Sequence, residues 1–157
     1  MPLIKPEDLS RTVAKPLRLL GLDLGTKTLG LALSDTSWNV ATPLETIRRR
    51  KFGLDADRLF SLIDEHGVGA LVLGLPLNMD GSEGPRCQAT RAFAANLFKL
   101  RDIPIVLQDE RLSTAAVERM LVNELDTSRK RRAQVVDKLA AAYILQSLLD
   151  RLRGSGR

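Results

Sequence analysis

The chain has few of the residues from which disulfides, zinc sites and base-stacking surfaces are built. Its 157 residues include one cysteine and one histidine, and only 4% are aromatic. A single cysteine excludes an internal disulfide and any cysteine-rich zinc site. So small an aromatic share argues against a stacking platform for single-stranded bases. Cys87 falls at an apolar position of a predicted helix, and we expect it to pack in the core.

Long apolar runs are also missing from the sequence. No segment approaches the roughly 20 apolar residues that a membrane-spanning helix requires. Residues 1–15 mix acidic and basic side chains without a continuous apolar segment, which is not the pattern of a secretory signal. We therefore expect a soluble cytoplasmic protein with no membrane partner. The length suits a single domain around one core.

Basic residues are in excess, and they are clustered. Lys and Arg number 24 against 19 Asp and Glu, which gives a net charge of +5. Two runs of basic residues, 48–51 and 129–132, concentrate this excess. A clustered positive charge favours a polyanionic partner such as nucleic acid, although either run could instead be a solvated loop.

The order of apolar patterns predicts an α/β fold. Apolar runs at 17–24 and 29–34, separated by a polar turn, predict a β-hairpin, and 43–48 predicts a third antiparallel strand. Helical periodicity then alternates with short apolar runs. We predict helices around 56–66, 85–101, 113–124 and 132–152, and strands at 69–73 and 103–107. The result is a mixed five-stranded sheet, three antiparallel strands then two parallel strands, flanked by helices.

The domain boundaries follow from the same patterns. We expect residues 1–16 to be a flexible N-terminal extension and residues 17–152 to form one domain. Residues 153–157, with their Gly-Ser-Gly sequence, are expected to be a disordered tail.

One carboxylate interrupts the first predicted strand. Asp23 alternates with Gly21 and Leu19 on one face, and leucines occupy the other face, so neither face is expected to be wet. An isolated carboxylate there would carry a large desolvation cost unless something compensates it. Asp23 could also lie at the strand end and accept hydrogen bonds from amides of the following turn. The strand alone favours neither interpretation.

Two further acidic positions favour a shared site. Asp137 heads an apolar stripe on the last predicted helix, and an Asp that only stabilised the helix dipole would not need that face. Asp109 and Glu110 directly follow a strand, where open α/β sheets carry functional loops, although an ion pair with Arg111 would also explain them. If Asp23, Glu110 and Asp137 converge, each pair repels by about 4 kcal/mol at 4 Å and an effective dielectric of 20.

Converging carboxylates predict bound cations. Ligation by oxygen alone suits hard ions such as Mg²⁺ or Mn²⁺ better than Zn²⁺. Two such ions could activate a water and stabilise the leaving oxygen of a phosphodiester. The basic run 129–132 precedes Asp137 by one to two helical turns, where a nucleic-acid backbone would approach. The predicted reaction is metal-dependent phosphodiester hydrolysis.

Four motifs, "GLDLGTKTLGLALSD", "GLPLNMDGSEGPR", "DERLST" and "VVDKLAAAYIL", carry a resemblance to a known family. From Leu17 to about Leu149 the chain resembles the YqgF (RuvX) family. That family is assigned to bacterial pre-16S rRNA processing and is related to Holliday junction resolvases of the RNase H-like fold. The resemblance implies this fold, and it implies Asp23, Glu110 and Asp137 as catalytic and metal-binding acids. The choice of Glu110 over Asp109 follows mainly from the resemblance. The residues before Lys15, and Thr28 where many members carry Arg, depart from the family pattern.

The expected substrate contacts surround these acids. Free amides at the helix start after the second motif could hold a phosphate, and Asp80 there could either assist the metal or only form a turn. Thr114 follows Ser113, which we expect to cap a helix. The full set of predicted substrate-binding residues is Lys27, Asn78, Arg86, Arg111, Thr114, Arg129, Lys130, Arg131 and Arg132.

Several functions remain open at this point. The preferred one is maturation of pre-16S rRNA, with pre-ribosomal particles as partners and a monomer or homodimer as the acting unit. Cleavage of branched DNA junctions is the alternative, and a non-catalytic RNA-binding assembly factor is a further one. "DLGTKT" is also similar to the phosphate-binding hairpin of actin and sugar-kinase ATPases. The chain is short for their two related domains, and no second hairpin of this kind is present.

Overall fold

A computed structural model describes the backbone of residues 3–110 and 129–155, and the side chains of residues 3–110 and 138–153. The predicted helix at 113–124 lies outside the described residues. None of the described helices combines the length and the apolar composition needed to cross a membrane.

The centre of the fold is a mixed β-sheet, as predicted. Strands β2 (Arg18–Leu24), β3 (Thr28–Ser34) and β4 (Ala41–Arg48) form an antiparallel meander. Strand β5 (Val68–Leu75) adds parallel to β2 on its other side, and β6 (Ile105–Asp109) adds parallel to β5. The carboxyl ends of β2, β5 and β6 therefore meet at one edge of the sheet.

A sixth strand corrects the predicted strand count of five. Strand β1 (Leu3–Ile4) pairs parallel with β6, and the sheet order is β1-β6-β5-β2-β3-β4. A 3₁₀ turn, η1 (Pro6–Asp8), and a short helix, α1 (Leu9–Thr12), follow it. Leu9 is fully buried. We expected residues 1–16 to lie outside the domain, whereas this segment contributes to both the sheet and the core. A two-residue strand is too short to produce a visible alternation.

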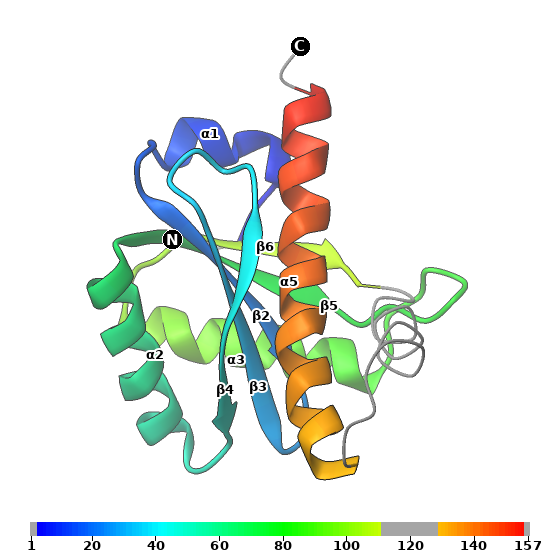
Figure 1. The fold of residues 1–157 in the computed structure, drawn as a ribbon. Helices are drawn as coiled ribbons and strands as arrows, with labels where there is room; N and C mark the ends of the chain where they lie inside the picture. The colour runs from blue at the N-terminus through cyan, green and yellow to red at the C-terminus, as the bar shows by residue number, and fades with distance from the viewer. Residues whose placement is uncertain (1–2, 111–128, 156–157) are drawn as a thin grey trace.

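Helices cover both faces of the sheet (Figure 1). Helix α2 (Phe52–His66) and helix α3 (Pro85–Leu100) cover one face, where the leucines of β2 that alternate with Asp23 join the larger core cluster. The long helix α5 (Arg129–Ser155) and the N-terminal segment cover the other face. Helix α5 begins before the predicted position 132 and continues through Ser155. The predicted disordered tail at 153–157 is therefore helical over 153–155.

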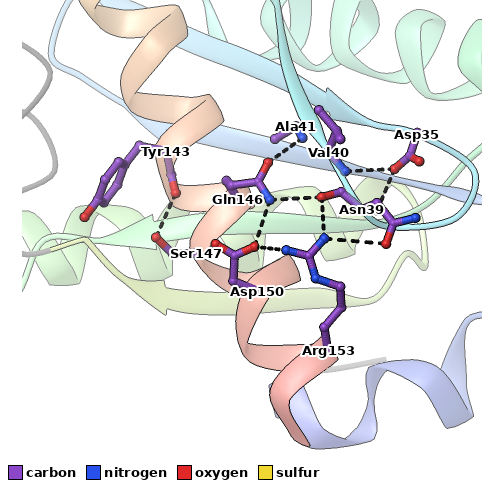
Figure 2. Close-up of polar contacts among 9 residues, drawn as sticks. All are labelled: Asp35, Asn39, Val40, Ala41, Tyr143, Gln146, Ser147, Asp150 and Arg153. Carbon is purple, nitrogen blue, oxygen red and sulfur yellow. Dashed lines mark hydrogen bonds and ion pairs between the residues drawn. The ribbon is translucent and has the colours of Figure 1, made fainter. Parts of the chain in front are cut away.

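Helix α5 is fixed to the sheet at two places. A Cβ atom at Gly21 would lie 2.9 Å from Cβ of Leu145 and 3.0 Å from the carbonyl oxygen of Ala141, so the helix packs directly on the β2 backbone. Near the start of β4, Oε1 of Gln146 accepts a 2.8 Å hydrogen bond from the N–H of Ala41 (Figure 2). Its Nε2 donates to the carbonyl oxygen of Asn39 at 3.0 Å.

Candidate active site

Asp23 lies on the face of β2 that α5 covers. It is partly exposed, whereas its neighbours Leu22 and Leu24 are buried on the opposite face. Gly21, two residues earlier on the same face, is the residue on which α5 packs. Asp23 therefore lies next to the helix contact, close to the carboxyl end of its strand.

Glu110 reaches the same edge of the sheet from β6. Its N–H donates a 3.2 Å hydrogen bond to the carbonyl oxygen of Leu75, which fixes it beside the end of β5. Its side chain occupies space left by Gly74. A Cβ atom at Gly74 would lie 2.9 Å from Cδ of Glu110, closer still to Oε2, and 2.5 Å from Cδ1 of Ile144. Glu110 therefore depends on a neighbour without a side chain.

The two carboxyl groups are in direct electrostatic contact. The pKa of Glu110 is raised from 4.5 to about 8, chiefly by burial, then by the negative charge of Asp23 and by a hydrogen bond with Asp23. The charge of Arg86 acts in the opposite direction, and that of Asp109 raises the pKa slightly further. Like charges held this close favour a state in which a proton or a cation neutralises them.

Glu110 and Asp109 occupy different environments, although they are adjacent in the chain. Glu110 is only partly exposed and contacts Asp23, whereas Asp109 is the exposed last residue of β6. Glu110 is therefore the acid that contacts Asp23, and Asp109 lies at the exposed border of the site. Sequence reasoning without the family resemblance could not separate them, because both follow the same strand.

The third predicted acid lies on the element that covers this site. Asp137 belongs to α5, one helical turn before Ala141, whose carbonyl oxygen approaches Gly21. Only the backbone of residue 137 is described, so its role stays a prediction. Among the residues with described side chains, no three His, Cys, Asp or Glu residues are grouped as a metal site. The Asp23–Glu110 pair supplies only oxygen donors, which fit Mg²⁺ or Mn²⁺.

The predicted substrate-binding residues are distributed around this edge of the sheet. Lys27 lies in the β2–β3 turn, three residues beyond the end of β2. Arg86 lies in the first turn of α3, close enough to lower the pKa of Glu110. Asn78 is part of the β5–α3 loop, where its Nδ2 donates to Oγ of Ser82 at 3.0 Å. Arg111 and Thr114 lie outside the described residues. Only the backbone is described for Arg129, Lys130, Arg131 and Arg132, in the first turn of α5.

Asp80 has a role within its own loop. One carboxylate oxygen accepts hydrogen bonds from the N–H of Ser82 at 2.9 Å and from Oγ of Ser82 at 2.6 Å. These are the contacts of a turn, which was one of the two interpretations left open for this residue. The loop that carries Asn78 is thereby held by its own side chains.

Gly74 is a site residue that sequence reasoning missed. It lies inside an apolar run that otherwise suits a buried strand. A glycine within a strand often marks a close approach by another group, and this signal was available. Which group approaches it could not be inferred, because Glu110 is 36 residues away in the sequence.

These features define a class of fold. A three-stranded antiparallel meander continued by parallel strands, with helices on both faces and acidic residues at the carboxyl ends of β2 and β6 on either side of β5, is the RNase H-like architecture. Solved structures agree. Thermus thermophilus RuvC in complex with a Holliday junction substrate has a TM-score of 0.54, is 15% identical and covers 87% of this chain and 96% of its own. The fowlpox virus Holliday junction resolvase has a TM-score of 0.52, 13% identity and covers 87% and 100%.

The sequence comparison is more specific. The sequence model of the RuvX family, described as Holliday junction resolvase, matches residues 17–151, and this chain belongs to that family. A Paramagnetospirillum magneticum protein is 62% identical over 154 residues, which cover 98% of this chain and 99% of that protein. A Rhodospirillum rubrum protein is 59% identical over 152 residues, which cover 97% and 94%. Both bear the name "Putative pre-16S rRNA nuclease".

Proposed function

We propose that this protein is a metal-dependent nuclease that hydrolyses phosphodiester bonds of pre-16S rRNA during ribosome maturation. The observation that carries the proposal is the contact between Asp23 and Glu110, two carboxyl groups brought together from β2 and the end of β6. Burial, and then the charge of Asp23, raise the pKa of Glu110 to about 8. A fold gains nothing in stability from bringing such groups together, so this arrangement favours a functional role. The names of the close relatives support the choice of substrate.

The metal would be held by Asp23, Glu110 and Asp137. When bound, a pair of Mg²⁺ or Mn²⁺ ions supplies an activated water and stabilises the charge that develops on the leaving oxygen. The chain's own contribution is to hold carboxylate oxygens at the carboxyl ends of β2 and β6, against the backbone of Gly74. Arg86 adds positive charge beside them, where a substrate phosphate would be neutralised.

The direct test is to offer two substrates to the purified protein. A 5′-extended small-subunit rRNA precursor and a four-way DNA junction are incubated with Mg²⁺, with Mn²⁺ or with a chelator. We expect RNA cleavage that requires the metal. Asp23→Asn and Asp137→Asn should abolish cleavage and leave RNA affinity nearly unchanged. Equal cleavage by the wild type and both variants would contradict the proposed site.

Junction cleavage is the second candidate function. The description of the matching family, Holliday junction resolvase, favours it. Resolution of a junction normally requires two active sites related by two-fold symmetry, one for each strand that is cut. Preferential cutting of the DNA junction by a dimer would therefore replace the RNA substrate with branched DNA. RNA binding without any cleavage would instead indicate a non-catalytic assembly factor.

A further inference from the structure

The basic run 48–51 lies beside the turn that follows Asp23. Arg48 is the last residue of β4 and pairs with Thr28 at the start of β3. The N–H of Arg49 donates a 2.9 Å hydrogen bond to the carbonyl oxygen of Lys27, and its guanidinium donates to that of Gly25 at 2.6 Å. The run is therefore tied to the β2–β3 turn through both the backbone and a side chain.

A buried acid holds the other end of the run. Asp55 is 4% exposed, and both of its carboxylate oxygens accept from the N–H of Arg50, at 3.1 and 3.2 Å. Asp55 lies in the first turn of α2, so the run passes directly from an edge strand into a helix. Its backbone is fixed at Arg49 and Arg50, in contrast to that of a freely solvated loop.

The three other side chains of the run have no acidic partner among the residues that the structure describes. Arg48, Arg50 and Lys51 are exposed, and none of them forms an ion pair with any residue that the structure describes. Other surface arginines of the chain differ in this respect, since Arg58 pairs with Glu45 and Arg91 with Glu83. Three positively charged side chains therefore extend from a fixed backbone, and none of them is paired with an acid among the described residues.

The sheet register relates this cluster to the candidate active site. Asp23 pairs with Gly30, and Gly30 pairs with Thr46, so these three residues lie on one face of the sheet. Arg48 is two residues further along β4, on that same face, because Ile47 between them joins the core on the opposite face. Strand spacing and rise put Cα of Arg48 about 12 Å from Cα of Asp23. The N-terminal end of α5 lies at this end of the sheet as well (Figure 1).

We propose that Arg48, Arg50 and Lys51 form a phosphate-binding surface for the backbone of the nucleic-acid substrate, a few nucleotides from the bond that is cut. The inference rests on the proposed function and deepens it, since it assigns a path to the substrate. Exposed, unpaired basic side chains on a rigid support bind phosphates without reading the base sequence. Arg49 is a positioning residue, because its guanidinium is engaged by the carbonyl oxygen of Gly25.

The test compares two triple variants that lose the same charge. The first carries Arg48→Ala, Arg50→Ala and Lys51→Ala. The control carries Arg11→Ala, Lys15→Ala and Lys99→Ala, which are exposed basic residues outside this surface; Lys15 and Lys99 precede the amino ends of β2 and β6. Binding of a labelled 5′-extended rRNA precursor is measured from about 50 to 200 mM salt, in an Asp23→Asn background that prevents cleavage.

Loss of three phosphate contacts should lower the slope of log affinity against log salt by about 2 to 3. Over this fourfold change in salt, the wild type should therefore lose about 16 to 64 times more affinity than the first triple variant loses. The control should keep the wild-type slope. With Asp23 restored, the first variant should show a raised KM and a nearly unchanged kcat.

Equal slopes for the two triple variants would overturn the inference. That outcome is distinguishable from failure of the proposed function, because cleavage of the same RNA by the wild type with Mg²⁺ is a separate measurement. A first variant that loses kcat at saturating RNA would also overturn it, since this surface would then act on the chemistry and not on substrate binding.

Discussion

Gly74 and Glu110 share one small space at the carboxyl end of the parallel strands. The Glu110 carboxyl group occupies the volume that a Cβ atom at position 74 would need, and Cδ1 of Ile144 in α5 lies against the same space. Gly74→Ala should therefore displace the Glu110 carboxylate from Asp23. A displacement of this kind reduces cleavage by about 100-fold. Single-turnover rates at saturating Mg²⁺, together with Mg²⁺ affinity measured by calorimetry, check the expectation.

The control for this variant lies on the same strand. A Cβ atom at Gly69 would lie 2.5 Å from Cγ1 of Val13 and 2.9 Å from Cβ of Leu17, which are apolar contacts away from Glu110. Gly69→Ala should cost about 1–3 kcal/mol of stability through overpacking and leave Mg²⁺ affinity unchanged. If both variants lowered metal affinity equally, a positioning role for Gly74 would be wrong.

The contact between Asp23 and Glu110 predicts a titration that the metal-free protein should display. The pKa of Glu110 is raised to about 8 by burial and by Asp23. Asp23→Asn removes the neighbouring charge, so the pKa of Glu110 should fall towards its ordinary value. Carbon-13 NMR of the side-chain carboxyl groups, recorded with chelator, measures both values. An unchanged titration in the variant would mean that burial alone causes the shift.

The raised pKa of Glu110 also predicts how the stability of the metal-free protein changes with pH. A raised carboxyl pKa means that the folded protein binds this proton more tightly than the unfolded chain does. The contribution of Glu110 to metal-free stability is therefore fully present below pH 4.5, and it falls as the pH rises through about 8. Added Mg²⁺ should restore stability at the upper end of this range, because it binds the folded carboxylates. Urea unfolding at several pH values, with and without Mg²⁺, tests both statements.

Local sequence patterns predicted most strands of the sheet and one acid of the site, Asp23. Long apolar runs predicted β2 and β3, and the alternation of leucines with Gly21 and Asp23 predicted which face carries the acid. The end of α2 at His66 followed from Gly67, which adopts the left-handed conformation that favours glycine.

The elements that the sequence did not reveal depend on distant partners. Strand β1 is only two residues long and exists because Leu3 pairs with Ile105, about a hundred residues away. The absence of a side chain at Gly74 matters because the Glu110 side chain, which follows β6, occupies that space. Such pairings leave no periodicity in the local sequence, because each is set by tertiary contacts.

The two hydrogen bonds of Gln146 to the backbone near β4 predict that replacing Gln146 lowers stability, whereas replacing its neighbour Ser147 does not. Gln146 accepts from the N–H of Ala41 and donates to the carbonyl oxygen of Asn39, so it joins α5 to the segment before β4 (Figure 2). Gln146→Ala should cost about 1–3 kcal/mol, because it leaves a partly buried amide without its acceptor. Ser147→Ala removes only a bond to the carbonyl oxygen of Tyr143 within the helix and should change stability by less than about 0.5 kcal/mol. The urea midpoints of the two variants measure this difference. Equal losses of stability would contradict a special role for Gln146.

Leu9 tests whether the N-terminal segment is part of the folded domain in solution. Its side chain is fully buried, in the core cluster beneath α5 that also contains Val13, Val106 and residues from the last turns of α5. Leu9→Ala should therefore cost about 2–5 kcal/mol, the range for a buried leucine whose site collapses only partly. Leu54→Ala is the matched control, since Leu54 is 47% exposed on α2 and its truncation should change stability by less than about 0.5 kcal/mol. Both variants are compared by urea denaturation. If the N-terminal segment were a flexible extension, Leu9→Ala would change stability as little as the control does. In that case β1 would contribute nothing to the stability of the sheet.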